Sequence, residues 1–431
     1  MRACAAPRIR VCAAWARGPR IPSLELVSGS RPASSPEQEE PLHTTVFRRH
    51  ARRVTLAAVV VGAVLAGTAC GPSEAAPQSS DATVREALED LVRNGFPGAQ
   101  VVISGPDGER VVTAGVGDIA GGAPIPDHAL VRIGSNTKTF VATVVLQLVA
   151  EGTLDLDAPV ERYLPGVIGG NGNDGNRITV RQLLQHTSGL PDYLGSGAPT
   201  ADNQVVQLNP HLESVRWQQY APEQLVGIAM TMPPQFEPGA KSVYTNTNYV
   251  LLGMLIERVT GQPYAAEIDR RIIERLGLRD TYVPADGDTG IRDPHPVGYQ
   301  ENDGKRVDFT ALDTSWAGAA GAMVSTGADV NRFFTALLAG ELLPAAQLAE
   351  MQRTVPFDRM ANAGYGLGLM RQSLACGQET WGHGGSIPGF GTRNGVRADG
   401  TAVTLIVNQL PTTEEQADME QHAYETAVCA A

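Results

Sequence analysis

Lysine is scarce in this chain of 431 residues. Among 34 basic residues only Lys138, Lys241 and Lys305 are lysines, so arginine carries nearly all of the positive charge. Arginine stays protonated in proteins, whereas a buried lysine amine can lose its proton. A lysine that is kept in such a chain is therefore a candidate for chemistry that needs a neutral amine.

Positive charge of any kind is in short supply beyond residue 69. From residue 70 onward the chain carries 24 basic against 42 acidic residues, a formal charge of −18. A surface of this sign repels nucleic acid, so we expect no nucleic-acid partner. The composition, 42% apolar and 19% charged, is that of a globular protein long enough for two packed lobes.

The apolar run from Val54 to about Leu65 is short for a helix that spans a bilayer. Basic residues precede it and small residues follow it, which is the pattern of an export signal. We therefore expect residues 1–69 to be a leader and export signal, with the true start near Val46, and residues 70–81 to be a linker. A permanent membrane anchor is the alternative interpretation of this run.

Cysteine is rare as well, with five in the chain. Cys4 and Cys12 would leave with the leader. Cys70 ends the sequence LAGTAC, which resembles a lipoprotein signal, so a lipid on Cys70 at the cell envelope and plain secretion both stay open. In an exported protein Cys376 and Cys429 are expected to form a disulfide, the alternative being two buried thiols.

Sequence patterns typical of helices and strands are found at both ends of the region 82–429. Helical spacing is found at 82–93 and about 413–428, and strand-like runs separated by turn residues at 99–119 and 380–409. The stretch between them, about 135–368, is mostly helical with long loops. This order predicts an α+β fold. We expect a mainly antiparallel five-stranded sheet built from both chain ends, flanked by N- and C-terminal helices, with a helical lobe inserted.

Ser135 and Lys138 stand at the head of an apolar helix. Gly134 allows a sharp turn before it, and residues three apart share a helix face, which brings the amine within reach of the hydroxyl. Residues 140–149 are apolar on nearly all sides, so this helix belongs inside the protein, where an unpaired lysine is costly. The alternative is that Ser135 caps the helix and Lys138 is solvated.

Other candidate residues are weak when each is taken alone. Tyr244-Thr-Asn246 fits a loop tyrosine, and His383 fits a surface histidine, although the two glycines after it permit close approach of a ligand. No second histidine or cysteine lies at metal-ligand spacing from His128 or His186. We therefore expect structural roles for these two histidines and neither a metal nor a cofactor.

Together, Ser135-Asn-Thr-Lys138, Tyr244-Thr-Asn246 and His383-Gly-Gly385 resemble the three signatures of the penicillin-recognising serine enzymes, which include D-alanyl-D-alanine peptidases and serine β-lactamases. The chain is similar in particular to secreted D-alanyl-D-alanine carboxypeptidases of actinomycetes. The resemblance spans about 82–429 and includes LLQHTSGLPDY, SWAGAAGAM around Trp316, GYGLGL and both cysteines of the expected disulfide. It implies a β-lactamase/transpeptidase-like fold with the site between the sheet and the helical lobe.

The resemblance also implies an acyl-enzyme mechanism. Ser135 would attack a carbonyl, and Lys138 and Tyr244 would hold and relay its proton, either of them being the base. Asn246 would bind the amide side chain of the substrate. His383 would orient Tyr244 and help to pass the proton to the leaving amine.

The substrate cleft follows from the same resemblance. Backbone N–H groups of Ser135 and Ser386 would form an oxyanion hole, and Trp316, Gly384 and Gly385 would line the cleft together with Ser386. Such donors are typically worth about 3 to 4 kcal/mol each.

Two positions depart from the carboxypeptidase pattern. The expected carboxylate-binding arginine is replaced by Met370, and the expected threonine is Gly384, while Ser386 keeps its hydroxyl. Arg371 is adjacent to Met370, but neighbouring side chains of a strand face opposite ways. Losing a bidentate carboxylate clamp weakens recognition of a free C-terminus.

Three functions stay open on the sequence alone. The first is a D-alanyl-D-alanine-type peptidase of the cell wall, the second a Tyr-x-Asn-type β-lactamase or esterase, and the third a penicillin-binding sensor that stays acylated. In each case we expect an exported monomer whose partner is a small peptide or a β-lactam.

Overall fold

The structure is a computed structural model that describes residues 80–195, 208–302, 304–357, 359–360 and 362–431. The expected leader and the candidate lipidation site Cys70 lie outside these residues, as does almost all of the expected linker. Among the helices that the structure describes, none is both long and apolar enough to cross a membrane.

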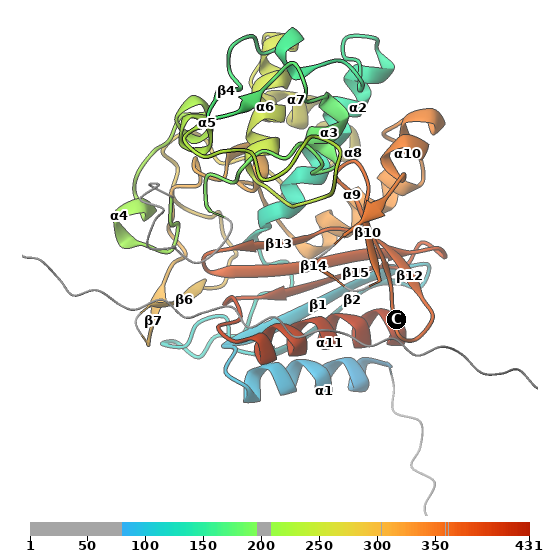
Figure 1. The fold of residues 1–431 in the computed structure, drawn as a ribbon. Coiled ribbons are helices and arrows are strands. Elements are labelled where there is room, and N and C mark those ends of the chain that lie inside the picture. Colours follow the sequence, from blue (N-terminus) through green and yellow to red (C-terminus); the bar gives the residue numbers. More distant parts are fainter. Residues whose placement is uncertain (1–79, 196–207, 303, 358, 361) are drawn as a thin grey trace, which may run out of the picture. The chain divides into compact units, whose positions relative to one another are not determined.

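A nine-stranded antiparallel sheet is built from both ends of the described chain (Figure 1). Its order is β2-β1-β15-β14-β12-β11-β10-β9, and β13 follows β12 along β14 and pairs with the other half of that strand. The strands are β1 (Gly98–Gly105), β2 (Gly108–Gly115), β9 (Val355–Pro356), β10 (Ala363–Tyr365), β11 (Met370–Ser373), β12 (Glu379–Gly382), β13 (Gly384–Ile387), β14 (Phe390–Arg397) and β15 (Ala402–Val407). Three small two-stranded sheets pair β3 (Val131–Arg132) with β8 (Val324–Ser325), β4 (Gly169–Gly170) with β5 (Asn173–Asp174), and β6 (Tyr299–Asn302) with β7 (Lys305–Asp308).

The antiparallel sheet made from both chain ends is confirmed, but the expected count of five strands is wrong. One expected strand is interrupted at His383 and becomes β12 and β13. The strands β9, β10 and β11 are additional, and they have two to four residues each, too few to show an alternating pattern in the sequence. The sheet therefore resumes at Val355, ahead of the expected end of the helical lobe near residue 368.

The remaining elements are helices, and most of them lie in the lobe on one side of the sheet (Figure 1). They are α1 (Ser80–Arg93), α2 (Thr137–Ala150), α3 (Val180–Leu184), α4 (Glu213–Arg216), α5 (Pro222–Met230), α6 (Thr247–Thr260), α7 (Tyr264–Ile268), α8 (Glu274–Leu276), α9 (Gly327–Leu338), α10 (Ala345–Met351) and α11 (Glu414–Ala430). The predicted terminal helices are confirmed as α1 and α11. Helix α6 ends at Gly261, whose φ of 69° is the left-handed conformation that favours glycine at a helix end.

The central strands are covered on both faces. Helices α1 and α11 lie side by side on one face (Figure 1), where Val84, Leu88 and Leu91 of α1 are buried against the sheet. Helix α9 packs on the opposite side of β1 and β15. Because neither face meets water, β15 reads as an unbroken apolar run rather than an alternating one.

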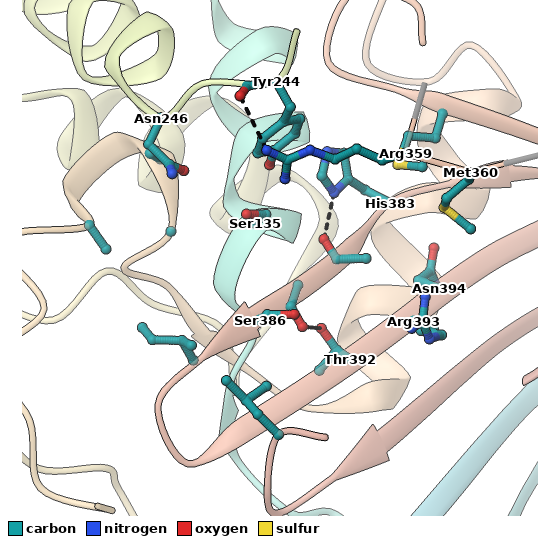
Figure 2. A pocket seen from close by; sticks show the side chains of 18 of the residues that line it. Ser135, Tyr244, Asn246, Arg359, Met360, His383, Ser386, Thr392, Arg393 and Asn394 are labelled. Carbon is teal, nitrogen blue, oxygen red and sulfur yellow. Dashed lines mark hydrogen bonds between the residues drawn. The ribbon is translucent and has the colours of Figure 1, made fainter. Parts of the chain in front are cut away.

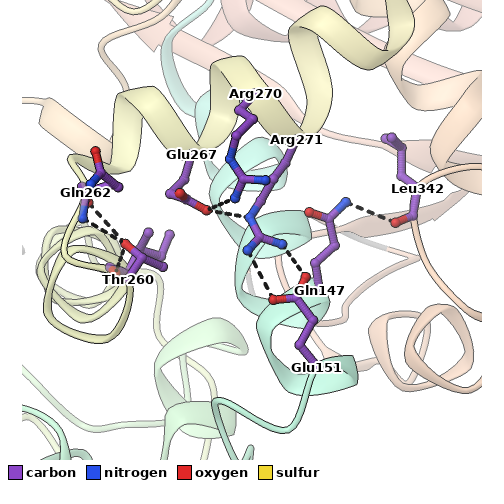
Figure 3. Close-up of polar contacts among 9 residues, drawn as sticks. Gln147, Glu151, Thr260, Gln262, Glu267, Arg270, Arg271 and Leu342 are labelled. Carbon is purple, nitrogen blue, oxygen red and sulfur yellow. Dashed lines mark hydrogen bonds and ion pairs between the residues drawn. The ribbon is translucent and has the colours of Figure 1, made fainter.

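Helix α2 is the central helix of the lobe, and nearly every one of its residues is buried. Its C-terminal end is fixed by ion pairs (Figure 3), because Arg271 pairs with both Glu267 and Glu151. Glu267 also pairs with Arg270 at 2.8 Å. These contacts tie the C-terminal end of α2 to α7 and the segment after it. The turn that precedes the N-terminal end of α2 contacts β13.

The disulfide between Cys376 and Cys429 is confirmed. It joins the β11–β12 turn to the last turn of α11 and so ties the closing helix to the sheet. The two cysteines are 53 residues apart in the sequence, and a loop of that size restricts the unfolded chain by about 4 kcal/mol in the entropic account.

We predict that the double variant Cys376→Ser/Cys429→Ser loses about 2 to 4 kcal/mol of unfolding free energy, because its unfolded chain regains that freedom. Urea denaturation followed by circular dichroism measures the loss, and intact mass confirms the bridge in the parent protein. An unchanged denaturation midpoint would contradict a stabilising role.

Candidate active site

A pocket of about 380 Å³ lies where β13 meets the helical lobe. The sequence-predicted residues that line it are Ser135, Tyr244, Asn246, Trp316, His383, Gly384, Gly385 and Ser386. Figure 2 shows Ser135 with Tyr244 and Asn246 on one side and Ser386 on the other. Three segments far apart in the sequence thus supply one cavity, as the motifs predicted.

Ser135 and Lys138 are in direct contact. Ser135 lies in the tight turn Gly134–Asn136 that leads into α2, and the Nζ atom of Lys138 is 3.0 Å from its Oγ atom. Lys138 Nζ also donates to Asn246 Oδ1 at 2.9 Å and to the Ala320 carbonyl at 2.7 Å. A neutral amine can keep these last two bonds and accept the hydroxyl proton of Ser135, so the geometry suits a base.

Lys138 is completely buried, and burial lowers its pKa to about 7. Asp192 opposes this shift, while Arg359 adds to it. No carboxylate among the described residues is hydrogen-bonded to the amine. A substantial fraction of Lys138 is therefore neutral near pH 7, which is what proton abstraction from a serine requires.

Tyr244 lies beside the amine, with Lys138 Nζ 4.8 Å from its ring centroid. Burial raises the pKa of Tyr244, and the nearby Ser135 hydroxyl opposes this rise only in part. Its hydroxyl is buried and has no hydrogen-bond partner of standard geometry among the described residues. Tyr244 is thus a neutral phenol with a free proton, which favours Lys138 as the base and Tyr244 as the acid.

Asp192 is a site residue that the sequence analysis missed. Its Oδ2 atom accepts hydrogen bonds from the backbone N–H of Asn246 at 2.9 Å and from the side-chain Nδ2 at 3.0 Å. Asn246 is therefore held so that its Oδ1 atom faces Lys138. The sequence does contain a signal that could have identified Asp192, because it is a charged residue inside the mostly apolar segment SGLPDYL. Burial raises the pKa of Asp192, against the lowering effect of the N–H groups of Asn246 and Leu194.

Glycine lets β13 approach the nucleophile turn closely. A Cβ atom on Gly385 would lie 1.9 Å from the Ile133 carbonyl oxygen, and one on Gly134 would lie 2.8 Å from the Ser386 nitrogen. Gly134 also has a φ of 50°, a conformation that favours glycine. The backbone nitrogens of Ser135 and Ser386 therefore flank the same end of the pocket, as an oxyanion hole requires.

His383 makes no direct hydrogen bond to Tyr244, so any orienting effect of His383 on Tyr244 is indirect. The Nε2 atom of His383 is 3.0 Å from the Tyr365 hydroxyl, and its Nδ1 atom is 2.6 Å from the Gly384 carbonyl oxygen. The ring centroids of His383 and Tyr244 are 6.3 Å apart. The motif identified a pocket residue correctly, but its hydrogen-bond partner comes from β10, which the sequence did not predict.

The side of the pocket beyond Tyr244 differs from the carboxypeptidase pattern as expected. Met370 lines the pocket, whereas Arg371 points away and pairs with Glu379 at 3.8 Å. The sequence did not single out Arg359. Its guanidinium lies 4.8 Å from the Tyr244 ring centroid and donates to the Tyr244 carbonyl at 3.4 Å (Figure 2).

His186, for which a structural role was expected, is fully buried with its ring centroid 4.2 Å from that of Tyr244. His128 is exposed. Within the described ranges, no group of three or more His, Cys, Asp or Glu side chains has an arrangement that could hold a metal ion.

The sequence profile of the Beta-lactamase family matches residues 81–427. The chain belongs to this family. The family's Ser-x-x-Lys motif falls on Ser135 and Lys138, whose side chains are in contact in this structure.

Known relatives of this family include hydrolases and penicillin-binding proteins. The chain is 40% identical to a D-stereospecific amidohydrolase from Streptomyces sp., with a TM-score of 0.71 over 80% of this chain and 98% of that one. It is 29% identical to a D-amino acid amidase from Ochrobactrum anthropi SV3, with a TM-score of 0.70 over 81% and 98% of the two chains.

A putative penicillin-binding protein, PbpX of Bacillus subtilis, is 26% identical over 335 residues, 77% of this chain and 75% of that protein. The chain spans less than half the length of some other curated relatives.

We predict that acylation of Ser135 rises with pH through the Lys138 pKa of about 7, because only the neutral amine accepts the serine proton. Lys138→Arg should lose at least about 100-fold in rate, since a guanidinium keeps its proton. Stopped-flow labelling by a fluorescent penicillin from about pH 5 to pH 9 measures both effects. Lys241→Arg, at an exposed position, is the matched control, and equal labelling of the two variants would contradict the assignment.

We also predict that Asp192→Asn moves the acid limb of this profile to lower pH by up to about 1 unit, because the carboxylate raises the pKa of Lys138. An asparagine oxygen can still accept both bonds from Asn246. Asp313→Asn, at another buried aspartate, is the control that should leave the limb in place. An acid limb that does not move in Asp192→Asn would show that the carboxylate does not affect the pKa of Lys138.

Proposed function

We propose that this protein is a serine hydrolase that cleaves amide bonds after D-amino acid residues, in D-amino acid amides and short peptides, through an acyl-enzyme on Ser135. The contact of Ser135 with a buried amine supports acyl-enzyme chemistry. The similarity to a D-stereospecific amidohydrolase over most of both chains supports the choice of D-configured acyl donors.

The proposed reaction assigns each proton to a described group. The Oγ atom of Ser135 attacks the substrate carbonyl carbon while its proton passes to Lys138 Nζ. The oxyanion that forms is held by the N–H groups of Ser135 and Ser386. As the C–N bond breaks, the Tyr244 phenol donates its proton to the leaving amine and regains one from Lys138. Water then hydrolyses the ester by the same steps in reverse.

Met370 is the observation that carries the choice of leaving group. Its apolar side chain lines the pocket where a carboxylate clamp would stand, and Arg371 faces away. A site without that clamp does not require a free C-terminal carboxylate on the leaving group. Ammonia and uncharged amines therefore fit this side of the pocket.

A second candidate is a carboxypeptidase of the D-alanyl-D-alanine type. Arg359 favours it, because this guanidinium lies over Tyr244 and has no ion-pair partner among the described residues. It lies in the same group of side chains as Met360 and Met370, around Tyr244. Arg359 would then take the place of the missing clamp.

We predict that the purified protein hydrolyses D-phenylalanine amide at least about 10-fold faster than the L-enantiomer. It should also cleave an N-acylated D-Ala-D-Ala dipeptide and its C-terminal amide at similar rates, because Met370 offers no charge to the carboxylate. Ser135→Ala is the control for background hydrolysis. A free acid that is cleaved faster than the amide, with the advantage lost in Arg359→Gln, would support the carboxypeptidase.

Intact-mass spectrometry in the presence of a chromogenic cephalosporin tests the remaining alternatives. Fast turnover of the cephalosporin would favour a β-lactamase. A lasting acyl adduct without turnover of any amide or ester would favour a penicillin-binding sensor and contradict the proposed hydrolase.

A further inference from the structure

Three buried side chains form a continuous chain of hydrogen bonds behind the pocket wall. From Gly384 on β13 the contacts run to His383 at 2.6 Å, from His383 to Tyr365 at 3.0 Å, and from Tyr365 to His186 at 3.3 Å. None of these three side chains is more than 4% exposed. We call His186, Tyr365 and His383 the histidine–tyrosine chain.

The acceptors at its ends fix where the protons lie. The carbonyl of Gly384 can only accept, so His383 carries its proton on Nδ1 and offers a lone pair at Nε2. Tyr365 must then donate its hydroxyl proton to His383 and accept the Nε2–H of His186.

At the His186 end of the histidine–tyrosine chain the proton position is also fixed by the hydrogen-bond partners. The Nδ1 atom of His186 accepts from the backbone N–H of Thr245 at 3.3 Å and from Asn248 Nδ2 at 3.2 Å. The amide of Asn248 is oriented because its Oδ1 atom accepts the Ser188 hydroxyl at 2.7 Å. Every nitrogen of both histidines therefore has a defined partner, and both rings are neutral.

The surrounding groups keep the chain neutral. Burial lowers the pKa of His383 to about 3, and that of His186 falls well below its usual value. The cations that face the chain are Lys138 and Arg359, and both oppose a further positive charge on His186. The neighbouring phenols Tyr244 and Tyr249 have pKa values raised by burial.

The two ends of the chain hold the two halves of the catalytic site. At one end His383 binds the carbonyl of Gly384, two residues before the oxyanion donor Ser386. At the other end His186 packs against the Tyr244 ring and binds the N–H of the next residue, Thr245. His186 itself adopts a φ of 58°, which is rare for a residue with a side chain and is retained at positions that the surroundings over-determine.

We propose that Tyr365 is a positioning residue that, through His186 and His383, sets the catalytic phenol of Tyr244 at a fixed distance from the oxyanion strand β13. Both nitrogens of His383 are occupied, so this residue holds the strand and carries no proton to the leaving group. The inference concerns the acyl-enzyme chemistry of the family and does not depend on the D-amino acid substrates of the proposed function.

The test is Tyr365→Phe, which keeps the ring and removes the one hydroxyl that joins the two histidines. We expect the maximal rate of Ser135 acylation by a fluorescent penicillin to fall about 10- to 100-fold, with little change in half-saturating concentration. The control is Tyr282→Phe. It removes a tyrosine hydroxyl that accepts the N–H of Arg292 and that is not part of the histidine–tyrosine chain. Equal acylation rates in these two variants would overturn the proposal.

Histidine side-chain NMR gives a readout that needs no substrate. In the parent protein, long-range ¹H–¹⁵N spectra should show the Nδ1–H tautomer for His383 and the Nε2–H tautomer for His186 at neutral pH. In Tyr365→Phe the pKa of His383 should rise, because the lone pair at Nε2 loses its donor. An imidazolium at His383 in the parent protein, or unchanged spectra in the variant, would overturn the proposal even if all D-amino acid substrates fail.

A double-mutant cycle separates positioning from general loss of stability. If His186 and Tyr365 act as one unit, His186→Gln/Tyr365→Phe should acylate about as slowly as the slower single variant. Rate losses that multiply would show that the two residues act independently, which contradicts a single chain. Urea denaturation of each variant corrects the rates for any unfolded fraction.

Discussion

The site depends on one buried amine. Lys138 has no exposed surface and no hydrogen-bonded carboxylate among the described residues, so the cost of desolvating an ammonium ion keeps its pKa near neutrality. A direct carboxylate partner would reverse this by stabilising the charged form. The fold instead places Asn246 between the amine and Asp192, so that the carboxylate orients the amide and opposes the desolvation of the lysine only in part.

The need to bury this amine explains the arrangement around it. Helix α2 is buried along nearly its whole length and carries Lys138 into the interior. Helix α6 begins directly after Asn246, so both active segments lie at the starts of helices in the middle of the protein. The strand β13 closes the cavity from the sheet, where Gly134 and Gly385 allow backbones to approach closely. Each lobe thus supplies half of a site that neither has alone.

The sequence predicts contacts between residues that are close together along the chain, and it misses hydrogen bonds between residues that are far apart. Ser135 and Lys138 are three residues apart on one helix face, so their contact follows from helical geometry. Asp192, which hydrogen-bonds Asn246, is 54 residues away from it in the sequence, and no spacing rule connects the two. His383 shows the limit most clearly, since its motif locates the residue, whereas its partner Tyr365 lies on a strand of three residues that no alternation reveals. Three motif residues together still located the pocket.

Neutral histidines and a titratable lysine are two results of the same dry environment. Desolvation disfavours a second proton, which would give a charged imidazolium, on His186 and on His383, and an ammonium at Lys138 disfavours it further. A proton that enters this part of the site therefore resides on Lys138, whose pKa of about 7 is the highest of the three. The histidines differ in that every one of their nitrogens is already hydrogen-bonded, which makes them rigid. Such a site separates the group that moves the proton from the groups that hold the geometry. A substitution in the histidine–tyrosine chain can therefore change the reaction rate without supplying or removing the base.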